Sequence, residues 1–307
     1  MSKPVEIVVI SGKGGTGKTV LTSSLAYLAD DKITADCDVD APDMHILLHP
    51  EIAKEEVFHG MKAARIDSSK CTGCGKCAEV CRFGAVDVRT SGEETSFSID
   101  PLGCEGCGVC VWMCPAEAIA FEGAIGGKWF ISETRFGKFV HAQLEPAQEN
   151  SGKLVSLVRS EARKLAEREG AGTVIIDGPP GIGCPVIASI AGVDLAVVVT
   201  EPTVSGIHDL DRVLGLVDHF GLKAGVVINK YDLNEEIATE IEEHLPGRGV
   251  TFLGRIPFGE EVKAAITAGE AVLEYGNGPV SSAVRVVGEN ILRLAADTRQ
   301  AGNESKG

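Results

Sequence analysis

Short apolar runs recur along this chain, and each ends in glycines or polar residues. Buried strands are predicted within 5–10, 33–43, 173–183, 195–202 and 224–232. Helical patterns lie among them, at 18–29, 155–169, 204–219, 234–244, 259–269 and 280–296. Strands alternating with helices predict an α/β fold with a doubly wound, mostly parallel sheet. Ligands of such a sheet bind at the carboxyl ends of its strands, where the polar clusters fall.

An internal repeat interrupts this alternation. The stretch IDSSKCTGCGKCAEVCRFGAV at 66–86 recurs 33 residues later as IDPLGCEGCGVCVWMCPAEAI at 99–119. Each half predicts a short strand, a loop and a short helix, which makes 63–122 a small α+β insert. Residues 1–62 and 123–298 then form one discontinuous domain, and 126–150 is predicted to be a hairpin that packs the insert onto it. The last residues, 299–307, are predicted to be disordered.

Eight of the ten cysteines lie in the repeat, in two runs with the spacing C-x2-C-x2-C-x3-C. This is the bacterial ferredoxin spacing, in which the fourth cysteine ligates the other cluster. Zinc sites are the alternative, but three close cysteines plus a fourth, repeated twice, favour two 4Fe–4S clusters. Arg82 stands where this motif usually has proline, whereas Pro115 follows the second run. The predicted ligand sets are Cys71, Cys74, Cys77 and Cys114 for one cluster, and Cys104, Cys107, Cys110 and Cys81 for the other.

A glycine-rich loop follows the first strand and precedes the first helix. Strand, loop and helix together are the context that defines a phosphate-binding P-loop. Lys18 is expected to reach the β- and γ-phosphates of a nucleotide, and Thr19 to ligate Mg²⁺. Asp177 ends a later apolar strand and is expected to hold the same Mg²⁺. The loop residues expected to bind the nucleotide are Gly12, Gly14, Gly15, Thr16, Gly17, Lys18 and Thr19.

A second lysine in the loop, Lys13, makes the sequence resemble the deviant Walker A group of MinD/ParA-type ATPases, Mrp-type cluster carriers and the nitrogenase iron protein. The resemblance implies ATP hydrolysis in a nucleotide-sandwich dimer, homodimeric or formed with a paralogue, with Lys13 reaching the partner's nucleotide. It further implies that Asp38 positions the attacking water. Asp36, Asp40 and Asp43 are read as helpers of Mg²⁺ or as solvent-facing neighbours.

The rest of the nucleotide site is expected on three loops. Gly181 lies in a segment, 178–181, whose position would report the γ-phosphate. Residues 229–232 spell NKxD, a guanine signature, but the resemblance implies that Asn229 contacts adenine and that Pro257 lies in the following loop. ATP is therefore favoured over GTP.

Two cysteines lie outside the repeat. Cys37, within a strand, is read as a core thiol. Cys184 lies seven residues after Asp177, where the nitrogenase iron protein has a cluster cysteine. The second cysteine of that protein has no counterpart here, so a buried thiol is favoured over a cluster ligand at Cys184.

The net charge of the chain indicates which classes of binding partner are unfavourable. The chain has 44 acidic and 29 basic residues, a formal charge of −15. Nucleic acids and membrane surfaces are anionic, so neither is an expected partner. The sequence shows no signal peptide pattern and no long apolar run, so a cytoplasmic protein is expected.

Three functions remain open. The favoured one is an ATP-gated electron-transfer protein that uses both clusters and docks on a redox acceptor. A cluster assembly or carrier ATPase, with a metallocluster acceptor, is the alternative, and a positioning ATPase is disfavoured. Similar insert-bearing ATPases are labelled cobyrinic acid a,c-diamide synthase-like, but no glutamine amidotransferase domain follows, so amide synthesis is not expected.

Overall fold

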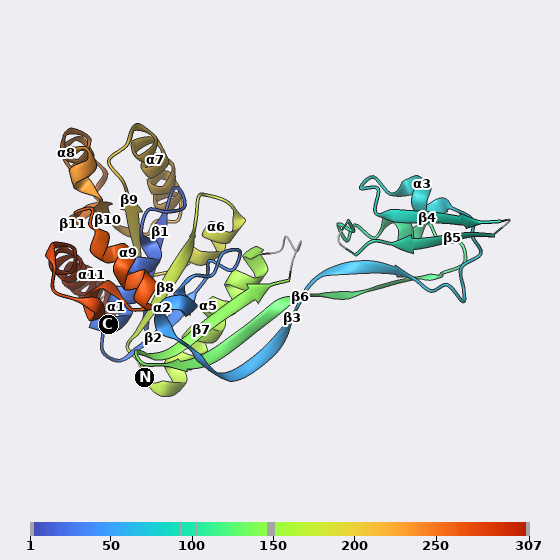
Figure 1. The fold of residues 1–307 in the computed structure, drawn as a ribbon, viewed down its shortest axis with the longest axis horizontal. Coiled ribbons are helices and arrows are strands. Elements are labelled where there is room, and N and C mark those ends of the chain that lie inside the picture. Colours follow the sequence, from blue (N-terminus) through green and yellow to red (C-terminus); the bar gives the residue numbers. More distant parts are fainter. Residues whose placement is uncertain (1–2, 93, 102, 146–150, 305–307) are drawn as a thin grey trace. The chain divides into compact units, whose positions relative to one another are not determined.

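The computed structural model describes residues 3–92, 94–101, 103–145 and 151–304. The chain divides into two compact units (Figure 1). The nucleotide unit comprises the chain up to Glu56, Trp129–Gln143 and the chain from Ser151 onward. The insert comprises Val57–Lys128 and a short segment that begins at Leu144. It is therefore wider than the predicted 63–122.

A single sheet forms the centre of the nucleotide unit. Its strand order is β11-β10-β9-β1-β8-β2-β7-β6-β3, and the pairs from β11 to β7 are parallel. The predicted doubly wound α/β fold is thus confirmed. The strands are β1 (Val5–Ser11), β2 (Lys32–Asp36), β3 (Glu51–Ile66), β6 (Ile119–Thr134), β7 (Gly137–Leu144), β8 (Thr173–Pro180), β9 (Leu195–Thr200), β10 (Lys223–Asn229) and β11 (Thr251–Ile256).

Helices of the nucleotide unit lie on both faces of its sheet (Figure 1). Val5, Ile7 and Val9 of β1 belong to one apolar core with residues of α1 and α11. Glu6, on the opposite face, contacts α5, as strand alternation requires. The helices are α1 (Lys18–Leu28), α2 (Met44–Leu48), α5 (Ser151–Glu169), α6 (Cys184–Ile190), α7 (Val204–His219), α8 (Glu235–His244), α9 (Glu260–Ala268), α10 (Val272–Tyr275) and α11 (Pro279–Glu304), with 3-10 turns η1 (Tyr231–Leu233) and η2 (Pro246–Arg248).

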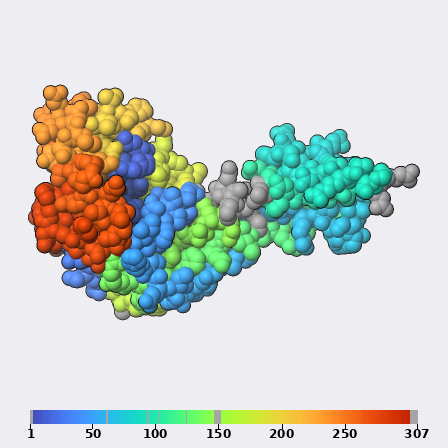
Figure 2. Space-filling view, viewed as in Figure 1, coloured from blue at the N-terminus to red at the C-terminus, as the bar shows by residue number. Residues whose placement is uncertain are grey.

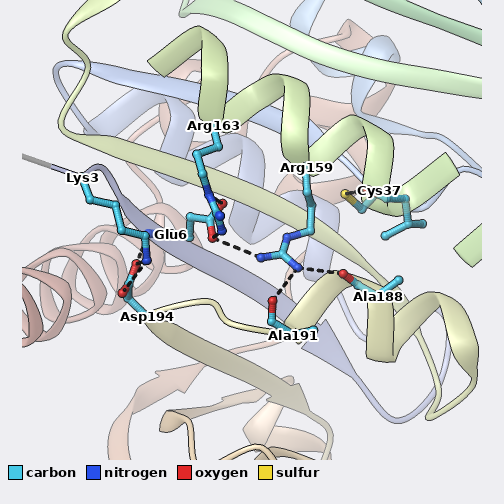
Figure 3. Close-up of polar contacts among 9 residues, drawn as sticks. Lys3, Glu6, Cys37, Arg159, Arg163, Ala188, Ala191 and Asp194 are labelled. Carbon is cyan, nitrogen blue, oxygen red and sulfur yellow. Dashed lines mark hydrogen bonds and ion pairs between the residues drawn. The ribbon is translucent and has the colours of Figure 1, made fainter. Parts of the chain in front are cut away.

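A buried ion cluster joins β1, α5 and α6 (Figure 3). Glu6 is fully buried and accepts hydrogen bonds from Arg159, at 3.1 Å, and from Arg163. Arg159 also donates to the carbonyls of Ala188 and Ala191, at 2.7 and 3.0 Å. These carbonyls lie at the C-terminal end of α6, where a cation is favourable. One guanidinium therefore fixes the helix that follows the loop at 181–183.

Both halves of the insert share one local plan. A strand leads into a cysteine loop, a short helix and a second strand: β3, α3 (Lys76–Val80) and β4 (Val86–Ser91) in the first half, then β5 (Glu94–Ile99), α4 (Val109–Trp112) and β6 in the second. β4 and β5 pair in antiparallel fashion. Ala64, Cys77 and Ile119 form a small core with apolar residues from both halves. The two repeats therefore fold as one body.

Several elements differ from the predictions. α11 continues to Glu304, so residues 299–304 are helical and not disordered; the last three residues lie outside the described part. Strand β2 ends at Asp36, and residues 37–43 form a loop before α2. β6 and β7 are neighbours joined by two residues, as the predicted hairpin requires, although residues 146–150 of that prediction are not described.

Candidate functional site: a phosphate loop and two cysteine-lined cavities

The loop between β1 and α1 opens onto a cavity of about 870 Å³ at the carboxyl end of the sheet. Gly14, Gly15, Gly17, Lys18 and Thr19 line it. Gly15 and Gly17 have φ of +78° and +92°, values that suit glycine, and so the loop can turn its backbone N–H groups inward. α1 begins at Lys18, which places the positive end of a helix at the cavity.

Two side chains show that the loop is built for a ligand. Lys18 is only 5% exposed, although lysine is rarely buried without a partner. The hydroxyl of Thr16 is buried without a hydrogen-bond partner in the described structure. A phosphate would supply the missing partner, so the loop residues fit the predicted nucleotide.

Close packing makes Gly12 and Gly17 sensitive positions. A Cβ at Gly12 would lie 2.4 Å from Cβ of Asp209, and one at Gly17 would lie 2.4 Å from Nδ2 of Asn229. A Cβ at Gly14 would meet nothing within 4 Å. The first two glycines are therefore required by sterics, whereas Gly14 faces open space.

Asp177 is positioned by two hydroxyls of α1. Thr19 donates to one carboxylate oxygen at 2.7 Å, and Thr22 donates to the other at 2.8 Å. Burial is the largest effect on the pKa of Asp177 and raises it, while Lys18 opposes the shift. Thr19 and Asp177, the predicted Mg²⁺ ligands, thus lie in direct contact. Burial favours the protonated form of Asp177, and a bound cation would favour its ionised form instead.

The side chain of Asp36 is buried and holds the backbone of the following loop, so it does not face solvent as the sequence analysis considered. It is 1% exposed, and its carboxylate accepts from the backbone N–H of Asp38 at 3.0 Å and of Met44 at 3.4 Å. It pairs in register with Asp177 across β2 and β8. Burial, and then the nearby Asp177, raise the pKa of Asp36 well above its ordinary value. Asp36 therefore shapes the loop that carries Asp38.

Asp38 lines the same cavity, together with the exposed Asp40 and Asp43. Burial raises the pKa of Asp38 to about 6, while Lys18 lowers it. A half-buried carboxylate beside the phosphate-binding lysine is suitably placed for a water-positioning group.

Lys13 has an intrachain partner. Its ammonium lies 3.1 Å from Glu201, and Lys230 contacts the other oxygen of Glu201 at 2.6 Å. Lys230 also donates to the carbonyl of Gly15 at 3.2 Å. Glu201 would therefore keep one cationic partner if Lys13 turned toward a second chain.

The NKxD sequence does not present its aspartate to the cavity. Asp232 accepts the backbone N–H of Phe258 at 2.7 Å and is not among the lining residues, whereas Asn229 and Pro257 are. The amide of Asn229 donates to the carbonyl of Thr16 at 2.7 Å. Guanine recognition would need that carboxylate at the base, so this arrangement favours adenine.

Gly181, predicted to lie in the segment that reports the γ-phosphate, has φ of +94° and donates its N–H to the carbonyl of Ser11 at 2.8 Å.

The cysteines of the insert gather around two small cavities. Cys71, Cys74, Cys77 and Cys114 line one of them. Cys81, Cys104, Cys107 and Cys110 line the other. Each cavity thus takes three cysteines from one repeat and the fourth from the other, which is the grouping that the ferredoxin spacing implies.

The surroundings of these thiols repeat as well. The N–H of Ala85 points at Cys81 and that of Ala118 at Cys114, each 3.4 Å from sulfur. Gly73, Gly75, Gly106 and Gly108 all have positive φ. N–H groups aimed at sulfur stabilise cluster ligands, so the residues fit a 4Fe–4S cluster in each cavity.

The thiols of each set line a cavity but do not meet at one point. Within the described residues, no three His, Cys, Asp or Glu side chains converge on a point where one metal ion could bind. Four thiolates around a cubane bind four different irons and so stand apart. Burial, and then neighbouring thiols, raise the pKa of Cys77 and Cys110, so that their thiolates need nearby positive charge, which irons would supply.

The two cysteines outside the repeat differ in their exposure to solvent. Cys37 is fully buried, as expected for a core thiol, and burial raises its pKa well above the ordinary value. Cys184 is exposed, so the prediction of a buried thiol was wrong. It occupies the first position of α6, whose buried residues are Val186, Ser189 and Ile190.

Sequence reasoning missed three residues of the site. Thr22 lies one helical turn after Thr19, a spacing that could have indicated its contact with Asp177. Glu201 directly follows β9, at the same edge of the sheet as the phosphate loop. Asp209 lies on α7, and nothing local in the sequence indicates its contact with Gly12.

A P-loop at the carboxyl end of a mostly parallel α/β sheet defines a nucleotide-binding protein. Residues 7–272 match the CobQ/CobB/MinD/ParA nucleotide binding domain, and the chain belongs to this family, whose MinD/ParA members are ATPases. It is 35% identical over 238 residues to the uncharacterized protein MJ0578 of Methanocaldococcus jannaschii, covering 75% of this chain and 79% of that protein.

A second relative from the same organism and a solved structure extend the comparison. The uncharacterized protein MJ0579 is 25% identical over 282 residues, covering 90% of this chain and 94% of that protein. The septum site-determining protein MinD of Pyrococcus horikoshii, complexed with Mg-ADP, superimposes with a TM-score of 0.59 at 16% identity, covering 96% of this chain and 98% of that one. The latter similarity shows the fold alone. In the described part of the chain, every helix is too short or too polar to cross a bilayer.

Proposed function

We propose that this protein is an ATPase whose nucleotide cycle is coupled to electron transfer through two 4Fe–4S clusters. The observation that carries the proposal is the crossed grouping of eight cysteines, three plus one around each cavity, within a chain of the MinD/ParA ATPase family. The clusters would supply one-electron chemistry. The nucleotide unit would supply a switch driven by ATP binding and hydrolysis.

The contacts of the nucleotide unit support the following proposed roles. Lys18 and the loop N–H groups bind the phosphates, Thr19 and Asp177 hold Mg²⁺, and Asp38 positions the attacking water. Asn229 and Pro257 line the base region, and the engagement of Asp232 elsewhere supports ATP over GTP.

Chain connectivity supports the coupling. The loop at 37–43 that carries Asp38 is followed by α2 and then by β3, which enters the insert at Val57. Movement of this loop during hydrolysis would thus act on a segment close in sequence to the first repeat. The family and the two M. jannaschii relatives support a nucleotide-dependent dimer, with itself or with a paralogue.

Anaerobic purification, iron and sulfide analysis and redox titration with and without ATP test the proposal. We expect about eight irons per chain and a redox response that changes with ATP. Cys74→Ser should lose about half of the iron, whereas the matched control Cys37→Ser, altered at a core thiol, should keep it all. Markedly fewer than eight irons would refute the two-cluster assignment. Transfer of clusters to an apo-acceptor under ATP would instead favour the alternative, a cluster assembly or carrier ATPase.

A further inference from the structure

The second repeat exposes apolar side chains that a folded surface rarely leaves uncovered. Trp112 is 90% exposed, Met113 46% and Val109 41%, all on or next to α4. They lie at spacings of three and four residues, so they share one helix face. Phe83, 52% exposed, lies near Val109, because both line the cavity of Cys81, Cys104, Cys107 and Cys110. We call Phe83, Val109, Trp112 and Met113 the Trp112 patch; it belongs to the insert, drawn in teal in Figure 2.

The first repeat provides an internal comparison. The 33-residue offset places Lys76 at the position of Val109, Glu79 at that of Trp112 and Val80 at that of Met113. Lys76 and Glu79 are exposed. A charged surface residue is ordinary, whereas an exposed Trp with apolar neighbours marks an interaction site. The fold is repeated, so it does not itself demand the apolar residues of the second half.

The charge of the insert is equally uneven. From residue 62 to residue 92 the sequence has six basic and three acidic residues, whereas from 93 to 127 it has six acidic and no basic ones. Of the latter acidic residues, Glu105, Glu117 and Glu122 are exposed. Glu105 also lines the cavity beside the Trp112 patch. Three of the four patch residues, Val109, Trp112 and Met113, therefore belong to the acidic half of the insert, whereas Phe83 belongs to the other half and follows the exposed Arg82.

We propose that the Trp112 patch is the docking surface for a redox protein whose own contact surface is apolar at its centre and basic at its rim. The patch would bury its aromatic and aliphatic side chains, and Glu105, which lines the same cavity as Phe83 and Val109, would attract the basic rim of the partner together with the other acidic residues of this half. Because Phe83 and Val109 line the second cavity, docking there brings a partner to the thiols of Cys81, Cys104, Cys107 and Cys110. This inference rests on the proposed function, since it assumes that the insert carries clusters.

Ferric cytochrome c, a basic one-electron acceptor protein, serves as the probe. Its equilibrium binding to the full chain should be measurable at low ionic strength and should weaken as salt is added. Trp112→Ala should weaken binding about tenfold or more. Joint replacement of Glu105 and Glu117 by Gln should weaken it severalfold and reduce its salt dependence. The matched control is Glu79→Ala, at the equivalent position of the first repeat, which should stay within about twofold of the wild type.

A rate measurement shows whether docking is productive. The reduced protein gives one electron to the ferric haem, which becomes ferrous, and no atom is transferred. Trp112→Ala should slow this transfer about as much as it weakens binding, while the rate with the neutral small acceptor menadione stays unchanged. Wild-type binding by Trp112→Ala, or an equal loss in Glu79→Ala, would overturn the docking surface. Iron analysis distinguishes failure of the docking surface from failure of the proposed function. If the protein holds about eight irons and Trp112→Ala has no effect, only the docking surface is refuted.

Discussion

Individual carboxylates carry the most informative chemistry of the nucleotide site. Asp36, Asp38 and Asp177 lie at or near the ends of the neighbouring strands β2 and β8, and burial raises the pKa of each. Lys18 is the cation whose charge opposes this effect at Asp38 and Asp177. The site therefore holds more negative charge than a folded chain readily stabilises, a condition that a bound Mg²⁺ relieves.

The raised pKa of Asp38 leads to a pH prediction for the nucleotide-free and Mg²⁺-free protein. The unfolded pKa is near 3.8 and the folded value about 6, so the folded chain binds more protons between these values. The contribution of Asp38 to stability is fully present below about pH 4 and is lost as the pH rises through 6. Asp38→Asn should thus raise the free energy of unfolding at pH 7 by about 1–2 kcal/mol and have little effect at pH 4.

Urea unfolding at the two pH values checks this prediction. The exposed Asp43→Asn should change stability little at either pH. Equal effects of Asp38→Asn at pH 4 and pH 7 would contradict the assigned titration. In the presence of MgATP, the same variant should bind nucleotide but lose hydrolysis.

At the scale of secondary structure, α6 depends on a charge cluster that is far from it in sequence. Arg159→Met should remove both hydrogen bonds to the end of α6 and leave the buried Glu6 with Arg163 alone. Breaking a buried pair is costly, so we expect a loss of about 2–4 kcal/mol in the free energy of unfolding. Chemical denaturation measures the loss.

Lys164→Met on the same helix is the matched control. Lys164 pairs with Glu161 at the surface, so its loss should cost no more than about 0.5 kcal/mol. Replacing Glu6 by Leu together with Arg159→Met should recover part of the stability, because no unpaired carboxylate then stays buried. A loss below about 1 kcal/mol in Arg159→Met would show that Arg163 suffices.

The length and the residue pattern of each element determined whether the sequence could predict it. The buried strands were recognised as continuous apolar runs bounded by glycine or polar residues, and the longer helices by a period that persists over several turns. The longest strands, β3 and β6, were predicted only in part, because much of their sequence is polar. α2, α6 and α10 span only four to seven residues, too few to show a helical period, and were not predicted. β11 was not predicted either, because Gly254 and Arg255 interrupt its apolar residues. The phosphate loop and the cysteine sets were predicted because local spacing encodes them. Glu201 and Asp209 were not, because only tertiary packing brings them to the loop.

For the whole molecule, we expect Lys13 to be the side chain on which a nucleotide-dependent dimer depends. Lys13 and Lys230 both pair with the half-buried Glu201, so Lys13 can turn away while this carboxylate keeps Lys230 as its partner. We expect Asp38→Ala, which should bind ATP without hydrolysing it, to form an ATP-dependent dimer. Adding Lys13→Ala should abolish that dimer, because the cation that would reach the partner's phosphates is gone.

Light scattering coupled to size exclusion, at saturating ATP, measures this difference. Lys230→Ala in the Asp38→Ala background is the control, since it disturbs the same glutamate but leaves Lys13 in place. A dimer that persists without Lys13, with ATP binding intact, would show that Lys13 acts only within its own chain.

The crossed cysteine grouping determines whether the insert could be divided into two working halves. Each cavity borrows one thiol from the opposite repeat, Cys114 for the first and Cys81 for the second. A chain cut after residue 92 would keep four of the eight thiols of the repeat, yet it would complete neither set. We therefore expect neither repeat to bind a cluster alone, even though the two repeats resemble each other in sequence.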